Sequence, residues 1–214
     1  KKEEHSEMLK KYTKKYNLSE NIIRILLNRN LGGDNEVDDF INPDIKKLRD
    51  PFKFENMEAI VKNILDRKSR QEKIFIYGDY DVDGITAAAF LTISFKNIGI
   101  DADYYIPDRM EEGYGLNKKA IDFINKSSGR LIITVDVGVN SAVEIEYAKQ
   151  LGIDVIVTDH HKILEEYGED IYTINPKVSK TYEFKSLAGA GVALKLSEAV
   201  YTRLGISASK PPCL

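Results

Sequence analysis

The spacing of apolar side chains predicts that the first 70 residues are mainly helical. Helices are expected in four segments: residues 1–16, 19–30, 37–41 and 56–68. Apolar residues recur on one face of the second and fourth segments, and Ser19 stands at the position of an N-cap. We expect residues 1–70 to form a helical lead-in that packs on the rest of the chain and carries no catalytic chemistry of its own.

From residue 73 onwards, short apolar runs alternate with longer amphipathic segments. The short runs are the expected strands: 74–77, 103–106, 131–135, 155–158 and 172–174. The longer segments are the expected helices: 85–97, 118–125, 142–151 and 192–204. Continuous apolar runs are typical of strands that are covered on both faces. The alternation therefore predicts an α/β domain over residues 71–214, with a mostly parallel, doubly wound sheet.

Composition and charge narrow the class of protein. The chain has 214 residues, of which 43% are hydrophobic and 30% charged, as in ordinary globular proteins. No apolar run is long enough to span a membrane, and the single cysteine is compatible with the reducing cytoplasm, where we expect the protein. A net charge of −3 excludes a uniformly basic nucleic-acid binder but leaves room for a local nucleic-acid site. Nothing in the sequence indicates a protein partner.

Three aspartates at alternate positions, Asp79, Asp81 and Asp83, follow the first expected strand. Carboxylates this close repel one another unless a cation lies among them, and divalent metals favour such oxygen ligands. The same pattern opens the calcium loop of an EF-hand, but that loop needs a glutamate at its twelfth position, where this chain has Phe90. A solvated acidic turn remains the alternative to a metal site.

Two further polar clusters follow expected strands. Asp136 comes after the third strand, and Asp159-His160-His161 comes after the fourth, although the chain has only three histidines. The carboxyl ends of parallel strands lie at one edge of a sheet, so these clusters are expected to meet there. Asp136 alone could equally be a helix N-cap. Together, the carboxylates and imidazoles predict a site for Mn²⁺, with Mg²⁺ as a substitute, and such a cluster can hold two ions.

Two loops are candidates for holding a substrate. Arg109 can bind a phosphate through two hydrogen bonds, and Tyr114 in the following glycine-rich turn can stack on a base. The alternative for this loop is an ordinary surface turn. Gly189 and Gly191 precede a helix, where backbone amides can receive a phosphate, but close helix packing explains these glycines equally well.

In their order and spacing, these motifs resemble a known family. Three segments, Gly78-Asp79-Tyr80-Asp81-Val82-Asp83-Gly84, Thr134-Val135-Asp136 and Asp159-His160-His161, are similar to the first three motifs of the DHH phosphoesterase superfamily. Within the superfamily, the similarity is greatest to bacterial exonucleases that digest single-stranded DNA from 5′ to 3′. It extends over about residues 19–205.

The resemblance implies roles for single residues. It implies four metal ligands: Asp81, Asp83, Asp136 and His160. It further implies that His161 contacts the scissile phosphate and that Asp159 orients an imidazole. Some DHH enzymes have a ligating histidine four residues before the first aspartate ligand, where this chain has Tyr77. Asp79 is therefore an additional candidate ligand.

The function implied by the resemblance is hydrolysis of phosphodiesters in single-stranded DNA by metal-activated water, in DNA repair and recombination. A DHH phosphoesterase acting on short oligonucleotides or cyclic dinucleotides, or a non-catalytic replication partner, are the alternatives. The superfamily also carries a fourth motif with an aspartate ligand after the last helix. The sequence after Leu204 contains no carboxylate side chain, so we expect this chain by itself to be weakly active.

Overall fold

The computed structural model describes residues 2–164 and 172–206. The chain clusters into two compact units, residues 1–48 and 49–214, and each unit is described by itself. The expectation about a fourth motif concerns residues that lie mostly outside the described ranges. The expected packing of residues 1–70 on the catalytic part stays a prediction.

The first unit is helical. It contains helices α1 (Lys2–Tyr16), α2 (Glu20–Asn28) and α3 (Asp34–Ile41) and the 3₁₀ turn η1 (Ile45–Lys47). Its small core includes Tyr12, whose hydroxyl donates to the Gly32 carbonyl and to Asp34 Oδ1, both at 2.8 Å. Ser19 occupies the N-cap position of α2, but its side chain makes no capping hydrogen bond. The predicted N-cap position of Ser19 is confirmed, and the cap is made without a side-chain hydrogen bond.

The second unit contains a five-stranded sheet. Its elements are η2 (Pro51–Lys53), α4 (Met57–Ser69), β1 (Lys73–Gly78), α5 (Val82–Asn97), β2 (Ala102–Tyr105), α6 (Lys118–Lys126), β3 (Gly129–Val135), α7 (Ala142–Gln150), β4 (Asp154–Thr158), β5 (Tyr172–Ile174) and α8 (Gly189–Arg203). All strand pairs are parallel, and the strand order is β2-β1-β3-β4-β5. The predicted α/β class with a parallel, doubly wound sheet is confirmed.

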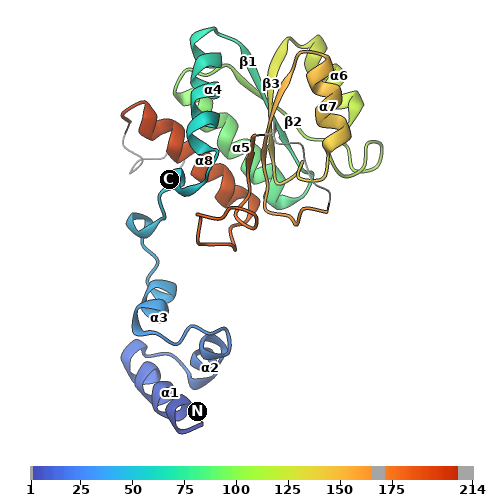
Figure 1. Ribbon diagram of the computed structural model, residues 1–214. Coiled ribbons are helices and arrows are strands. Elements are labelled where there is room, and N and C mark those ends of the chain that lie inside the picture. The colour runs from blue at the N-terminus through green and yellow to red at the C-terminus, as the bar shows by residue number, and fades with distance from the viewer. Residues whose placement is uncertain (1, 165–171, 207–214) are drawn as a thin grey trace. The chain divides into compact units, whose positions relative to one another are not determined.

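Helices cover both faces of the sheet (Figure 1). Helices α4, α5 and α8 pack on one face, where Ile74 and Ile76 of β1 belong to the larger core cluster. Helices α6 and α7 pack on the other face, where Phe75 and Tyr77 belong to a second cluster. Successive side chains of a strand point to opposite faces, so a strand buried on both sides must be apolar throughout. This explains the continuous apolar runs of the sequence.

The strand order determines where a ligand can reach the sheet. The chain runs from β1 to β2 on one side and then returns past β1 to β3 on the other side, so the direction of the strand order reverses between β1 and β3. In open α/β sheets, ligands bind beyond the carboxyl ends of the strands at such a reversal. All three polar clusters of the sequence follow the ends of β1, β3 or β4. Among the described residues, no helix is long and apolar enough to cross a membrane.

Candidate metal centre

The structure brings the three clusters together at the carboxyl edge of the sheet. Two groups of side chains have potential ligand atoms within 4.8 Å of one another. One group contains Asp136, His160 and His161, and the other contains Asp79, Asp81 and Asp136. Asp136 belongs to both groups. It follows β3, the central strand of the sheet, and therefore lies between the ends of β1 and β4.

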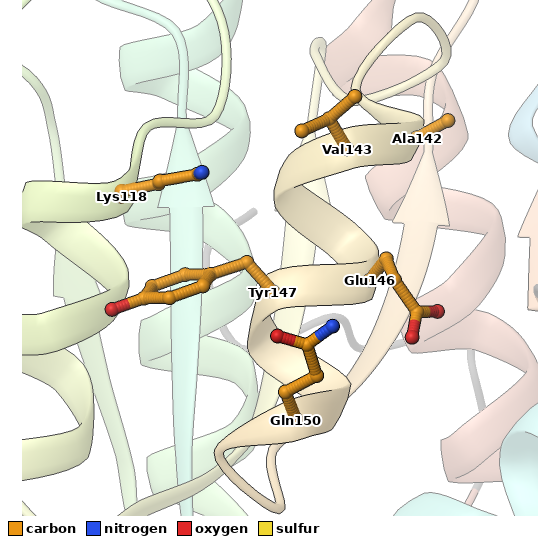
Figure 2. Close-up of a pocket in the computed structure, with 6 residues that line it drawn as sticks. All are labelled: Lys118, Ala142, Val143, Glu146, Tyr147 and Gln150. Atoms are coloured by element: carbon orange, nitrogen blue, oxygen red, sulfur yellow. The ribbon is translucent and has the colours of Figure 1, made fainter.

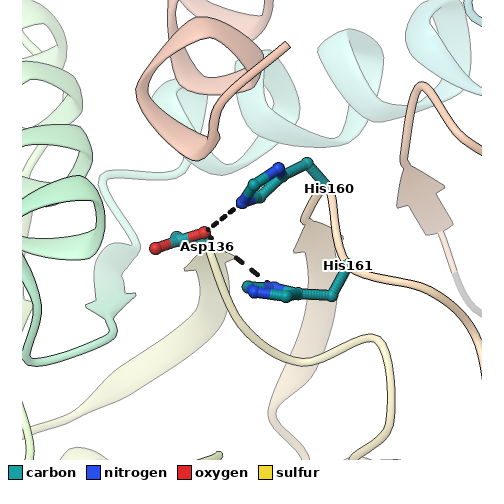
Figure 3. Close-up of side chains that lie close together, drawn as sticks. All are labelled: Asp136, His160 and His161. Atoms are coloured by element: carbon teal, nitrogen blue, oxygen red, sulfur yellow. Dashed lines mark ion pairs between the residues drawn. The ribbon is translucent and has the colours of Figure 1, made fainter. Parts of the chain in front are cut away.

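The two histidines converge on Asp136 (Figure 3). Asp136 Oδ1 lies 3.0 Å from His160 Nε2 and 3.9 Å from His161 Nδ1. The backbone of Asp136 has a φ of +61°, in the left-handed region that few residues other than glycine adopt. Aspartate tolerates this region better than most residues, and such strained conformations cluster at functional sites.

The buried carboxylates at this centre fit a bound cation. Oδ1 of Asp79 and Oδ1 of Asp136 are buried and accept no hydrogen bond of good geometry from the described residues. Burial, reinforced by the carboxylates of Asp83 and Asp81, raises the pKa of Asp136 to about 8. Burial also raises the pKa of Asp79. A divalent cation would supply the missing partner and stabilise the ionised carboxylates.

The other two aspartates are held by helix N-termini. Asp81 caps α5, because its Oδ1 accepts hydrogen bonds from the amides of Asp83 and Gly84 at 2.8 and 3.0 Å. Asp83 reaches across to α8, where its two oxygens accept from the amides of Gly189 and Ala190 at 2.7 and 2.8 Å. Asp83 Oδ2 also lies 3.6 Å from His160 Nε2. The metal centre is thus tied to the starts of two helices that pack together.

The start of α8 contains both candidate glycines. The amides of Gly189 and Ala190 donate to Asp83, so this carboxylate occupies the place where a phosphate was expected, and a substrate contact of Gly189 or Gly191 stays a prediction. Close packing also explains Gly189, since a Cβ at this position would lie 2.6 Å from the Cβ of Asp136. A Cβ on Gly191 would lie 3.1 Å from the Leu187 side chain. The first glycine lets α8 approach the metal centre.

Asp159 organises the histidine loop. Its Oδ1 accepts from the amides of His160 and His161 at 2.7 and 3.0 Å and lies 2.8 Å from His161 Nδ1. Its Oδ2 accepts from the Val139 amide at 3.0 Å, so the carboxylate also fixes the loop after β3. Asn175 holds the same loop by donating from Nδ2 to the His161 carbonyl at 2.9 Å. Sequence reasoning missed Asn175, because a single asparagine after a short strand gives no signal.

Burial of the imidazole lowers the pKa of His160, and the charge of the neighbouring His161 lowers it further. The lowered pKa favours the neutral imidazole, which is the form that binds metals.

The loop between β2 and α6 brings both predicted substrate residues near the centre. The Arg109 guanidinium lies 5.3 Å from the centre of the Tyr80 ring, beside the acidic turn. The Tyr114 ring is 57% exposed and lies edge-on to His161, with 6.3 Å between the ring centres and 81° between their planes. Burial of its hydroxyl and the nearby carboxylates raise the pKa of Tyr114. Both side chains can therefore meet a substrate at this site.

Two stacked tyrosines anchor that loop. The rings of Tyr77 and Tyr105 are paired across β1 and β2, with 5.6 Å between their centres. The Tyr77 hydroxyl donates to the Gly115 carbonyl at 2.8 Å and accepts from Asn117 Nδ2 at 3.2 Å. The Tyr105 hydroxyl donates to Glu112 at 2.6 Å. At the position where some DHH enzymes have a ligating histidine, this chain thus has a residue that holds the loop of Tyr114.

A surface hollow lies away from these residues. It has a volume of about 400 Å³ and lies between α6 and α7, with Lys118, Glu146 and Tyr147 on its walls (Figure 2). The Tyr147 hydroxyl donates to Asp122 at 2.7 Å, and Lys118 lies 5.2 Å from the centre of the Tyr147 ring. None of the predicted site residues lines this hollow.

Comparison with known proteins defines the family. The model of the N-terminal domain of the DHH family matches residues 73–211, and the chain therefore belongs to the DHH family. The single-stranded-DNA-specific exonuclease RecJ of Bacillus subtilis is 37% identical over 92% of this chain. RecJ of Escherichia coli is 40% identical over 62% of this chain. This chain spans only about a quarter of the length of these curated relatives, 25% and 23%.

Solved structures agree with this assignment. A crystal structure of exonuclease RecJ bound to manganese superimposes with a TM-score of 0.69 and 29% identity, covering 77% of this chain and 41% of that protein. RecJ from Thermus thermophilus in complex with Mn²⁺ superimposes with a TM-score of 0.65 and 26% identity, covering 80% and 23%. Both relatives hold manganese, the metal predicted from the donor set.

Proposed function

We propose that this chain carries the catalytic DHH domain of a single-strand-specific DNA exonuclease that uses Mn²⁺, or Mg²⁺ in its place. The observation that carries the proposal is that two potential ligand groups share Asp136. Asp79 and Asp136 each have a buried carboxylate oxygen that accepts no hydrogen bond of good geometry from the described residues. The similarity to RecJ proteins over most of the chain supports the choice of substrate. Digestion from 5′ to 3′ is part of the proposal.

The geometry supports two ion positions that share Asp136. Asp79 and Asp81 would hold one ion, and His160 would hold the other. Asp83 uses one lone pair of each oxygen for α8, and its Oδ2 near His160 retains another for the second ion. When bound, such a pair of ions lowers the pKa of a water nucleophile and neutralises charge on the phosphoryl oxygens.

The remaining residues would bind and orient the DNA. Asp159 occupies Nδ1 of His161, which leaves Nε2 of that imidazole to contact the scissile phosphate. Arg109 would bind a phosphate, and Tyr114 would stack on a base. Stacking requires unpaired bases, so single strands are preferred over blunt duplexes, and the phosphate contacts make binding weaker at high salt.

The test is digestion of single-stranded DNA labelled at either end, with Mn²⁺ added or removed by a chelator. We expect metal-dependent release of the 5′ label first and little digestion of a blunt duplex. Dinucleotides and cyclic dinucleotides serve as competing substrates. Asp136→Asn should abolish activity, whereas Asp101→Asn, which changes an exposed aspartate before β2, should retain it. Preference for dinucleotides, or equal digestion of duplex and single strand, would contradict the proposal.

A further inference from the structure

A second hollow adjoins the metal centre on the side of the sheet covered by α6 and α7. Its volume is about 310 Å³. Tyr114, Gly115 and Leu116 form one wall, and the loop between β3 and α7 forms the opposite wall. Asp159, which holds His161, is part of the lining. This hollow, called the side pocket below, therefore opens next to the proposed scissile phosphate.

The lining of the side pocket combines apolar and polar groups in nearly equal shares. Leu116, Val137 and Val139 are buried members of the second core cluster. Asn140 is fixed at both ends of its amide, because Nδ2 donates to the Lys162 carbonyl at 3.1 Å and Oδ1 accepts from the Leu164 amide at 2.8 Å. A preformed pocket that combines apolar surface with fixed polar groups can hold a small molecule and set its orientation.

The charges of the side pocket indicate which part of a nucleotide, its phosphate, sugar or base, can bind there. Glu144 and Asp159 contribute carboxylates, and none of the described residues that line it is a lysine or arginine. A phosphate would be repelled by these carboxylates, and a sugar would leave the apolar surface unsatisfied. A flat, uncharged base has apolar faces and polar edges, so it fits the mixed lining and is not repelled by the carboxylates.

We propose that the side pocket receives the base of the terminal nucleotide while its phosphodiester lies at the metal centre. This inference rests on the proposed function. Tyr114 lies on the wall of the pocket and edge-on to His161, so its ring joins the two subsites. The pocket takes the base through apolar contact and stacking, which every base can make, so it accepts all four. Binding of the terminal base in the side pocket places the first phosphodiester of the strand at the metal centre.

The first test is equilibrium binding, which does not depend on turnover. The Mn²⁺-loaded chain is titrated in a calorimeter with deoxycytidine 3′-monophosphate, whose phosphate is attached as in the terminal nucleotide of a strand digested from its 5′ end. The comparison ligand is 2-deoxyribose 3-phosphate, which lacks the base. Stacking on one aromatic side chain corresponds to about a tenfold or greater difference in affinity, so we expect the nucleotide to bind at least tenfold more tightly. Equal affinities would overturn the inference.

A matched pair of variants locates the effect. Glu144 lines the side pocket from α7, and Glu144→Phe should fill it and remove the difference between the two ligands. Glu146 lies on the same helix but lines the hollow between α6 and α7, so Glu146→Phe should keep the difference (Figure 2). As a control for folding, we expect both variants to bind Mn²⁺ with the same affinity as the unchanged chain. Retention of the difference in Glu144→Phe would overturn the inference.

A second measurement separates this inference from the proposed function. The unchanged chain is given single-stranded DNA with an ordinary or an abasic terminal residue. We expect KM to rise about tenfold for the abasic end, with a smaller change in kcat. Digestion of both ends with equal KM would overturn the side pocket and leave the exonuclease function in place. Base-dependent nucleotide binding without any digestion of DNA would overturn the function and leave the pocket.

Discussion

The aspartates on the two sides of the metal centre differ in burial and in hydrogen bonding. On the side of α5 and α8, Asp81 and Asp83 accept hydrogen bonds from four backbone amides at the starts of these helices. On the side of β3, Asp136 is 1% exposed and has a φ of +61°. Its Oδ1 lies 3.0 Å from His160 Nε2 but accepts no hydrogen bond of good geometry from the part of the chain that the structure describes. The first pair stabilises the fold whether or not a metal is bound. Asp136 destabilises the metal-free fold.

This difference implies that Asp81 and Asp83 mainly anchor the helices, whereas Asp136 mainly binds the metal ion. A carboxylate at a helix N-terminus is stabilised by the unpaired amides and the helix dipole. A buried carboxylate that lacks hydrogen bonds destabilises the fold until a cation binds. Its interaction with the cation therefore contributes strongly to the free energy of metal binding. Variants on the two sides should accordingly shift metal affinity and stability in different proportions.

The largest effect is expected for Asp136→Asn. Asparagine has nearly the same shape and also tolerates a positive φ, so the substitution removes the charge while keeping the backbone. Asp136 is common to both potential ligand groups. Loss of groups that merely orient ligands commonly reduces affinity about 10–100-fold, and loss of the shared ligand should exceed about 100-fold. Mn²⁺ titration by calorimetry measures this, and a change of less than threefold would show that Asp136 is not a ligand.

A smaller effect, on stability, is expected for Asp83→Ala. The change removes the acceptor of two amides of α8 and thus one of the links between that helix and α5. Hydrogen bonds to charged groups contribute about 1.5–3 kcal/mol each. Since Asp83 is partly exposed, water can replace part of this, and we expect a loss of about 2 kcal/mol. Urea denaturation with a chelator present measures it. At pH 8, Asp136→Asn should raise stability in the same assay, and a loss there would contradict the comparison.

The sign of the pH dependence follows from the raised pKa of Asp136. The folded pKa is about 8, against a usual value of 3.8, so the folded metal-free chain binds a proton that the unfolded chain releases. Its stability should therefore be fully present at low pH and fall as pH rises toward about 8. One proton gives a slope of at most about 1.4 kcal/mol per pH unit. Denaturation between pH 5 and 8 with a chelator should show this decline, and Asp136→Asn should flatten it.

The sheet and the meeting of the clusters could be predicted from the sequence, because both follow from local patterns. Continuous apolar runs marked the strands, and residues after parallel strands must share an edge. Helix starts were less visible. Helix α5 begins at Val82 rather than at residue 85, because Asp81 caps it within the acidic run. The hydrogen bond from the Gly189 amide to Asp83 joins residues 106 positions apart, so no local sequence pattern predicts it.

The anchoring tyrosines were missed for a similar reason. Tyr77 lies in an apolar strand, where burial alone explains an aromatic residue. Its partner, the Gly115 carbonyl, is a backbone group 38 residues away and cannot be identified by residue type. The stack with Tyr105 depends on the register between β1 and β2, which the sequence does not specify.

The smallest effect is expected for Tyr77→Phe, which tests whether the substrate loop is anchored independently of the metal centre. The variant keeps the stack on Tyr105 and removes the hydrogen bonds with Gly115 and Asn117. Two neutral hydrogen bonds contribute about 1–2 kcal/mol, so the loop that carries Tyr114 should become less well positioned. We expect KM for single-stranded DNA to rise about three- to tenfold and Mn²⁺ affinity to stay unchanged.

Tyr147→Phe is the matched control for this variant. It also removes one tyrosine hydroxyl, which donates to Asp122 at 2.7 Å, but it lies between α6 and α7 and away from the centre. A general loss of stability would affect both variants, whereas loss of loop position should raise KM only in Tyr77→Phe. Reduced amide-exchange protection at residues 113–117 should accompany the change in KM. Equal KM values in the two variants would show that Tyr77 stabilises the fold without positioning the substrate loop.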